Sequence, residues 1–173
     1  ADISRTWVCG DRPSAGQRRL YALAVEQIEF NLALLKPGLF LRELSERAWP
    51  IPEEFRGNRY SCIGHGVGLA DEYPSLVHAE DFASVGYDDV LRANTTLCIE
   101  SYIGAVGGKE GVKLEQLVLV TKDGAPIPAA PGTVRAGSPL RFPTETVAVS
   151  TLLPNYDQYA GPPIELGHME PTS

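Results

Sequence analysis

The sequence has no long apolar run and no block of like charges. No stretch approaches the roughly eighteen apolar residues of a membrane-spanning helix, and no basic region followed by an apolar one opens the chain. The net charge of -7 is spread along the sequence, which argues against nucleic acid as a partner. We therefore expect neither a membrane nor a nucleic acid as partner, while an acidic chain is able to hold divalent cations.

Cysteine is scarce as well, with three residues in the chain. Cys9, Cys62 and Cys98 are an odd number and lack the CxxC spacing of zinc ribbons. Each lies in an apolar or strand-like context, so we expect buried free thiols. Free thiols are typical of a reducing compartment, and we expect a cytoplasmic protein.

The remaining composition, 43% hydrophobic and 21% charged over 173 residues, is typical of one folded globular domain. A chain of this size buries enough surface to need no disulfide or structural metal. We place the folded domain at residues 1–137. Residues 138–173 are rich in proline and have little periodicity, so we expect an extended tail that wraps the domain or a neighbouring subunit.

Hydrophobic periodicity predicts several regular elements. Ser14 is a plausible N-cap for a helix that Lys36-Pro37-Gly38 stops. The other predicted elements are a strand over residues 2–9, a helix over 39–47, and two strands over 95–103 and 112–121. Because the first strand begins without Met, cap or leader, we expect that sequence upstream of Ala1 is missing.

Residues 60–68 contain too much glycine for a helix or for an ordinary strand interior. Such a segment allows the backbone to come close to another group. His65 lies inside it, between Gly64 and Gly66. An imidazole in this setting is able to approach a shared site without steric hindrance.

Two glutamates occupy strand positions where the pattern favours apolar residues. Glu100 and Glu115 lie on the two predicted strands, and an antiparallel pairing would place their carboxylates opposite each other. Carboxylates that close repel unless cations or shared protons compensate. With His65 they form a set that suits manganese, iron, cobalt or zinc. A lone strand glutamate more often faces solvent, and a lone histidine is more often packed or exposed than a ligand.

Other motif interpretations are weaker. The glycines of residues 64–68 do not match GxGxxG, which disfavours a dinucleotide site. Ser61 and Ser101 lack the elbow sequence of serine hydrolases. His78 and His168 fall in predicted loops, and we expect both to be solvated.

Four separate segments resemble the creatinase, prolidase and methionine aminopeptidase family. They are Ala1-Asp2-Ile3-Ser4-Arg5-Thr6-Trp7, Ile63-Gly64-His65-Gly66-Val67-Gly68-Leu69, Cys98-Ile99-Glu100 and Lys113-Leu114-Glu115. Their order and gaps fit the family over residues 1–125. The resemblance implies an α+β pita-bread fold, a curved antiparallel sheet backed by helices, of which this chain is the C-terminal part.

The family holds two metal ions with two aspartates, a histidine and two glutamates, and the resemblance assigns four of these positions. Asp2 corresponds to the second aspartate, His65 to the histidine, Glu100 to the next ligand and Glu115 to the glutamate that bridges the metals. The first aspartate would lie upstream of Ala1. Iron is favoured, with manganese, cobalt or zinc as alternatives.

The peptidases of the family carry a second histidine, followed by glutamate, just past the metal histidine, where this chain has Glu72 and Tyr73. Residues 68–74 instead resemble the branch that cleaves dimethylsulfoniopropionate. In that branch the reaction needs a base for the proton next to the substrate carboxylate. Asp71 is the candidate base, and Tyr60 would orient the substrate or face its sulfonium group.

These observations leave three hypotheses of different classes. The first is a metal-dependent lyase, a homodimer in a bacterial cytoplasm, that acts on a small zwitterionic substrate. The second is an Xaa-Pro metallopeptidase of the prolidase or aminopeptidase P type. The third is a pita-bread binding module without catalysis, which would not need to keep the four visible ligands.

Overall fold

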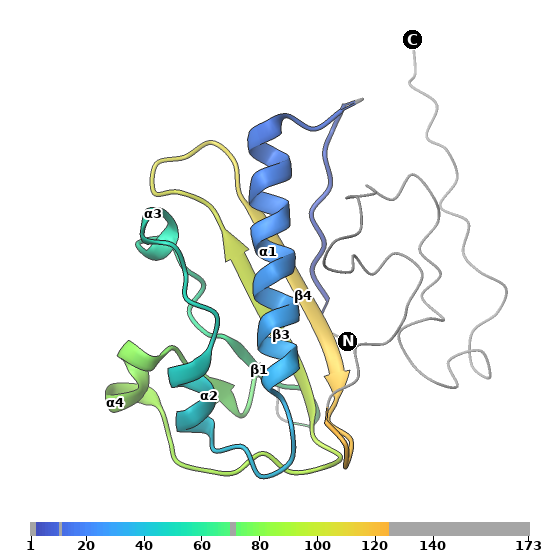
Figure 1. Ribbon diagram of the computed structural model, residues 1–173, viewed down its shortest axis with the longest axis vertical. Helices are drawn as coiled ribbons and strands as arrows, with labels where there is room; N and C mark the ends of the chain where they lie inside the picture. Colours follow the sequence, from blue (N-terminus) through green and yellow to red (C-terminus); the bar gives the residue numbers. More distant parts are fainter. Residues whose placement is uncertain (1–2, 11, 70–71, 125–173) are drawn as a thin grey trace, which may run out of the picture.

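The computed structural model describes residues 3–10, 12–69 and 72–124. Within these ranges, helices flank one antiparallel sheet (Figure 1). The helical elements are α1 (Ala15–Leu34), α2 (Leu41–Arg47), α3 (Glu53–Arg56), the 3-10 helix η1 (Ala79–Asp81) and α4 (Phe82–Val85). The strands are β1 (Gly64–Gly66), β2 (Ser75–Leu76), β3 (Thr96–Ile103) and β4 (Val112–Leu119).

Helix α1 begins at the predicted cap. The Ser14 hydroxyl accepts a hydrogen bond from the backbone N–H of Gln17 at 3.1 Å, and the Gln17 side chain accepts one from the N–H of Ser14 at 2.8 Å. This capping box satisfies two backbone donors that the first helical turn would otherwise leave unpaired. The helix buries one face against the sheet with residues that include Ala24, Ile28 and Leu32.

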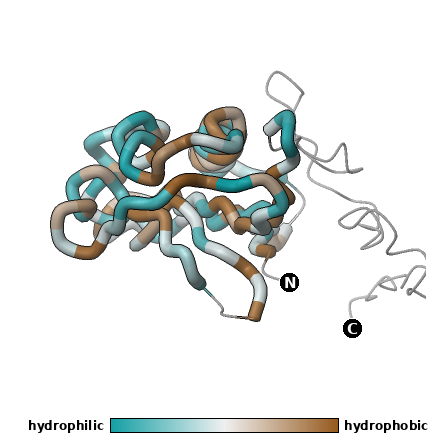
Figure 2. Tube along the Cα trace, turned by 90° about the horizontal axis from the view of Figure 1, so that it is seen from below, coloured by the Kyte–Doolittle hydropathy of each residue, from teal (hydrophilic) through white to brown (hydrophobic). Residues whose placement is uncertain are grey.

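The sheet has the strand order β2-β1-β3-β4, with every neighbouring pair antiparallel. The register of β3 and β4 places Glu100 directly opposite Glu115, which confirms the predicted arrangement. Helix α1 packs on β3 and β4 (Figure 1), and hydrophobic and hydrophilic segments are interspersed along the trace (Figure 2). Because side chains alternate along a strand, β3 and β4 each have one face toward α1 and another on the opposite side of the sheet.

The glycine-rich segment forms a strand, which the sequence analysis did not expect. β1 lies between β2 and β3 and is buried throughout. A Cβ atom on Gly64 would collide with the backbone oxygen of Cys98, and one on Gly66 would collide with the backbone of Tyr73. Glycine therefore does not weaken this strand but permits its close packing, and the predicted close backbone approach is confirmed.

The segment over residues 3–8 is extended but is not a regular strand, in contrast to the prediction. It runs beside β4, where the N–H of Glu115 donates to the Ser4 carbonyl at 3.1 Å. The Thr6 hydroxyl accepts from the N–H of Lys113 at 2.9 Å and donates to its carbonyl at 2.8 Å. A side chain thus takes the place of backbone partners, so no continuous ladder forms.

The cysteines differ from the expected buried thiols, because Cys9 is exposed, Cys62 is partly exposed and Cys98 alone is buried. His78 is buried rather than solvated, with 8% of its surface exposed. Asp2, Asp71, His168 and the predicted tail over residues 138–173 lie outside the described residues. Among the helices described, none is both long and apolar enough to cross a membrane.

Candidate metal centre

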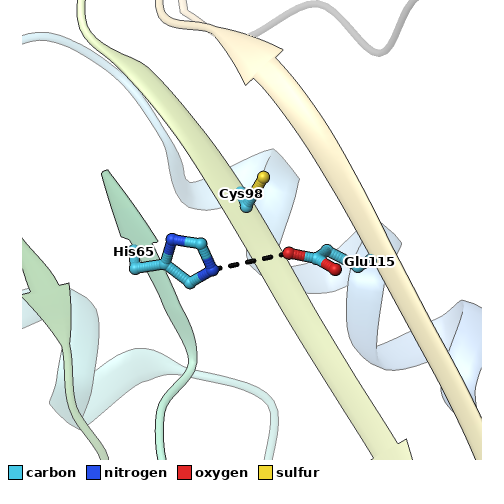
Figure 3. A group of neighbouring side chains, drawn as sticks. All are labelled: His65, Cys98 and Glu115. Carbon is cyan, nitrogen blue, oxygen red and sulfur yellow. Dashed lines mark ion pairs between the residues drawn. The ribbon is translucent and has the colours of Figure 1, made fainter. Parts of the chain in front are cut away.

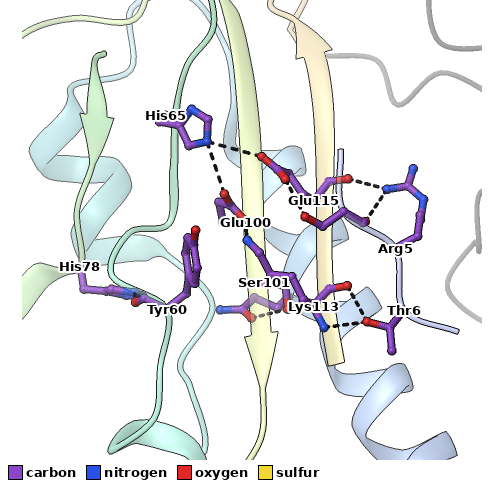
Figure 4. Close-up of polar contacts among 11 residues, drawn as sticks. Arg5, Thr6, Tyr60, His65, His78, Glu100, Ser101, Lys113 and Glu115 are labelled. Atoms are coloured by element: carbon purple, nitrogen blue, oxygen red, sulfur yellow. Dashed lines mark hydrogen bonds and ion pairs between the residues drawn. The ribbon is translucent and has the colours of Figure 1, made fainter. Parts of the chain in front are cut away.

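Side chains from three neighbouring strands converge on one point of the sheet (Figure 4). His65 Nε2 lies 3.3 Å from Glu100 Oε1 and 3.4 Å from Glu115 Oε1, and all three side chains are buried. The register explains the meeting, because His65 lies opposite Cys98 in the β1–β3 pair. Cys98 and Glu100 are two residues apart on the same face, and Glu115 lies opposite Glu100.

The contact that His65 Nδ1 makes defines the tautomer of the neutral ring. Its Nδ1 lies 3.1 Å from the Gly66 carbonyl oxygen, which is only an acceptor, so Nδ1 donates the hydrogen bond. In a neutral imidazole, Nε2 then presents a lone pair toward the two carboxylates. Three acceptor atoms facing one another require a cation among them or a second proton on the ring.

Each glutamate has a second partner on its other oxygen. The Ser4 hydroxyl donates to Glu115 Oε2 at 2.9 Å, and the Lys113 ammonium forms an ion pair with Glu100 Oε2. Arg5 supports the same strand by donating to the Glu115 carbonyl oxygen at 2.5 Å. One oxygen of each carboxylate is thereby held by the protein, and the Oε1 atoms remain directed at His65.

The donor set fits a divalent cation. Glu115 Oε1 is buried and accepts no hydrogen bond from the residues that the structure describes. Cys98 Sγ, His65 and a Glu115 oxygen offer ligand atoms that all lie within 4.8 Å of one another (Figure 3). Imidazole, carboxylate and thiol donors together suit borderline dications such as iron, cobalt and zinc.

Tyr60 lies beside this centre, in contact with one of its charged residues. The Lys113 ammonium lies 3.6 Å from the centroid of the Tyr60 ring, so one face of the ring holds a protein cation. The Tyr60 carbonyl oxygen lies 3.0 Å from His78 Nε2, which must donate because a carbonyl only accepts. Burial lowers the pKa of His78, and this contact with the Tyr60 carbonyl partly opposes the shift.

The structure brings together three of the four predicted metal ligands, His65, Glu100 and Glu115. Asp2 and the candidate base Asp71 lie outside the described residues. Ser4, Lys113 and Cys98 are not among the residues predicted from the sequence to form the site. The sequence could have indicated Lys113 and Cys98, because each precedes a predicted ligand by two residues and so shares its strand face.

Comparison with known proteins agrees with this geometry. Residues 1–122 match metallopeptidase family M24. The dimethylsulfoniopropionate lyase DddP of Roseovarius nubinhibens is 42% identical over 124 residues, which are 71% of this chain and 28% of the lyase. The chain therefore spans about a quarter to a third of the length of such curated relatives.

Solved structures of prolidases share the fold. Prolidase from Pyrococcus furiosus is 30% identical with a TM-score of 0.56, over 72% of this chain and 35% of that one. Xaa-Pro dipeptidase from Bacillus anthracis is 28% identical with a TM-score of 0.59, over 76% of this chain and 36% of that one. These neighbours have the pita-bread fold, and the described sheet and helices match part of it.

Proposed function

This chain belongs to metallopeptidase family M24, and from that premise we propose that it supplies metal ligands and the general base to a lyase. The proposed reaction cleaves dimethylsulfoniopropionate to dimethyl sulfide and acrylate. The observation that carries the proposal is that the buried side chains of His65, Glu100 and Glu115 meet at one point. They do so in a chain that is 42% identical, over 124 residues, to a dimethylsulfoniopropionate lyase. A purely binding module would gain nothing from two buried carboxylates that face an imidazole.

The elimination requires a base and a route for the electrons. Asp71 takes a proton from the carbon next to the substrate carboxylate, and the C–H electron pair becomes the double bond of acrylate. The C–S bond breaks, and its electron pair leaves with dimethyl sulfide. Asp71 then passes its proton to water. The metal ions, held by Asp2, His65, Glu100 and Glu115, would supply Lewis acidity to the substrate carboxylate.

Tyr60 is the proposed substrate-orienting residue. Tyr60 is 36% exposed beside the buried centre, which supports contact with a substrate that arrives from solvent rather than a role in the apolar core. Because Lys113 lies over one face of the ring, the sulfonium would meet the other face or the hydroxyl group. A cation over an aromatic face gains roughly 0.5 to 2 kcal/mol, so Tyr60 would adjust binding more than chemistry.

Xaa-Pro peptide hydrolysis is the second candidate, favoured by the likeness to solved prolidases at 28–30% identity. Glu72 and Tyr73 weigh against it, since they replace the His-Glu pair of the peptidases that the sequence resembles. Iron as the metal, a homodimer and a bacterial cytoplasm stay predictions from the sequence.

Two assays on the full-length protein separate the candidates. We expect dimethyl sulfide release from dimethylsulfoniopropionate and no free amino acid from Xaa-Pro dipeptides. Asp71→Asn should retain the bound metal and lose dimethyl sulfide release by roughly 100-fold or more, as loss of a positioned base does. Near-normal turnover of that variant would remove Asp71 from the mechanism, and peptide hydrolysis by the parent protein would favour the second candidate.

A further inference from the structure

We propose that Cys98 binds the metal through its thiolate, as a sulfur ligand beside the oxygen and nitrogen ligands predicted from the sequence. The inference rests on the proposed metal centre and extends it by one donor. Its consequence is a centre that prefers thiophilic borderline dications over hard ones such as magnesium or calcium.

The strand register places Cys98 in the centre. It lies directly opposite His65 in the β1–β3 pair and two residues before Glu100, so the three side chains share one face of the sheet. Cys98 is 0% exposed, and Figure 3 shows its side chain on β3, next to the side chains of His65 and Glu115. The thiol therefore lies at the centre rather than in the apolar core under α1.

The spacing of the ligand atoms is compatible with a shared ion. Those of Cys98, His65 and Glu115 all lie within 4.8 Å of one another. Metal bonds of about 2.0 to 2.3 Å bring neighbouring ligand atoms to within roughly 3 to 3.5 Å, and opposite ones to within roughly 4.5 Å. The pair His65 Nε2 and Glu115 Oε1, at 3.4 Å, already has the separation of neighbouring ligands. Small adjustments of the Cys98 and Glu115 side chains would complete the set.

A second observation points to a ligand independently of the thiol. Glu115 Oε1 is buried, accepts no hydrogen bond within the described part of the chain, and faces His65. Cation binding would satisfy this oxygen, which the protein otherwise leaves to electrostatics alone. The Cys98 sulfur lies within 4.8 Å of a Glu115 carboxylate oxygen, which distinguishes it from an ordinary buried cysteine.

Charge balance within the described residues accommodates the thiolate. Coordination requires loss of the thiol proton, which passes to the buffer. Cys98, Glu100 and Glu115 would then contribute three negative charges. The Lys113 ammonium, ion-paired with Glu100, balances one of them, and a dication balances the other two.

Cobalt(II) provides a direct test, because thiolate coordination to cobalt gives an intense charge-transfer absorption in the near ultraviolet. We expect this absorption when the metal-free full-length protein is titrated with cobalt(II). Cys98→Ser, which keeps the size of the side chain, should bind cobalt and lose at least nine-tenths of the absorption. Cys9→Ser and Cys62→Ser are matched controls that should retain it, since neither cysteine belongs to the centre.

The outcomes separate this inference from the function on which it rests. Stoichiometric cobalt binding without the absorption, or full absorption in Cys98→Ser, would overturn the thiolate ligand and leave the lyase proposal intact. Failure of the parent protein to bind any dication would overturn both. If Cys98→Ser does not fold, X-ray absorption of the zinc-loaded parent protein decides, because a thiolate ligand requires sulfur at about 2.3 Å from zinc.

Discussion

Strands β3 and β4 have two faces with different chemistry, one buried against α1 and one buried only around Cys98, Glu100 and Glu115. The face toward α1 carries Leu97, Ile99 and Leu114 and is apolar except for polar groups such as Ser101, whose hydroxyl donates to Gln27 of α1 at 2.7 Å. The other face carries Cys98, Glu100, Lys113 and Glu115. The first face gains roughly 25 cal/mol for each Å² of apolar surface removed from water, whereas the second must offset the desolvation of charges. The face toward α1 therefore stabilises the fold, whereas we propose that the other face holds the metal.

We call the face that carries Cys98, Glu100, Lys113 and Glu115 the site face. Removing a charge from the site face should have the largest effect on function and little effect on folding. In Glu115→Gln we expect metal content to fall below stoichiometric levels and dimethyl sulfide release to fall by 100-fold or more. The free energy of unfolding of the metal-free protein should stay equal or rise, because an uncompensated buried charge is gone. Elemental analysis, the lyase assay and urea unfolding measure the three quantities. Full metal content in this variant would contradict the assignment of Glu115.

The matching change on the α1 face should show the reverse pattern. Leu97→Ala removes a fully buried side chain and should lower the free energy of unfolding by about 2 to 5 kcal/mol. Metal bound per folded molecule should not change. Leu119→Ala is the control on β4, on the face away from α1, where the side chain is 47% exposed and the expected loss is within about 0.5 kcal/mol. Metal loss in the folded Leu97 variant would show that the two faces are coupled.

A dication that binds to Glu115 and its neighbours should stabilise the folded state of the parent protein. A dication at one hundred times its dissociation constant adds about 2.7 kcal/mol to the free energy of unfolding if it binds only the folded state. The gain should disappear in Glu115→Gln and on addition of a chelator. Thermal unfolding at fixed protein concentration provides the measurement, and an equal shift in parent and variant would place the bound ion elsewhere.

The Ser14 cap stabilises α1, the helix that covers the apolar face of the sheet, so its removal should lower the stability of the fold. Ser14→Ala removes the hydroxyl that caps the helix and should lower the free energy of unfolding by about 0.5 to 2 kcal/mol. Ser14→Asp should restore most of it, since aspartate is an equally good cap. Urea unfolding of the two variants decides, and equal losses in both would exclude the cap as the cause.

His78 should give the smallest effect, visible as a pH dependence. Burial lowers the pKa of His78 in the folded protein, so the unfolded chain takes up the proton first as the pH falls below about 6.5. Its contribution to stability is therefore complete at higher pH and is lost progressively in mild acid. His78→Gln should flatten this part of the profile relative to the parent protein. A parallel profile would assign the acid sensitivity to other groups.

The amino-acid sequence by itself determined the local elements and the candidate ligands. The Ser14 cap, the span of α1 and the two long strands follow from patterns within a few residues, because capping and periodicity act over one or two turns. Glu100 opposite Glu115 followed from antiparallel pairing of the two strands on either side of residues 104–111, in which Ile103 pairs with Val112.

Only the tertiary structure decided which distant groups meet the glutamates. Ser4 and Glu115 are 111 residues apart in the chain, and no periodicity relates them. The central position of β1 likewise depended on close packing against Cys98 and Tyr73, which its glycine content permits but does not specify. The sequence places Cys98 on the same strand face as Glu100, but only the sheet order placed it opposite His65. Local sequence patterns determine which residues form helices and strands. Which strands pair, and therefore which distant side chains meet, depends on the packing of the whole domain.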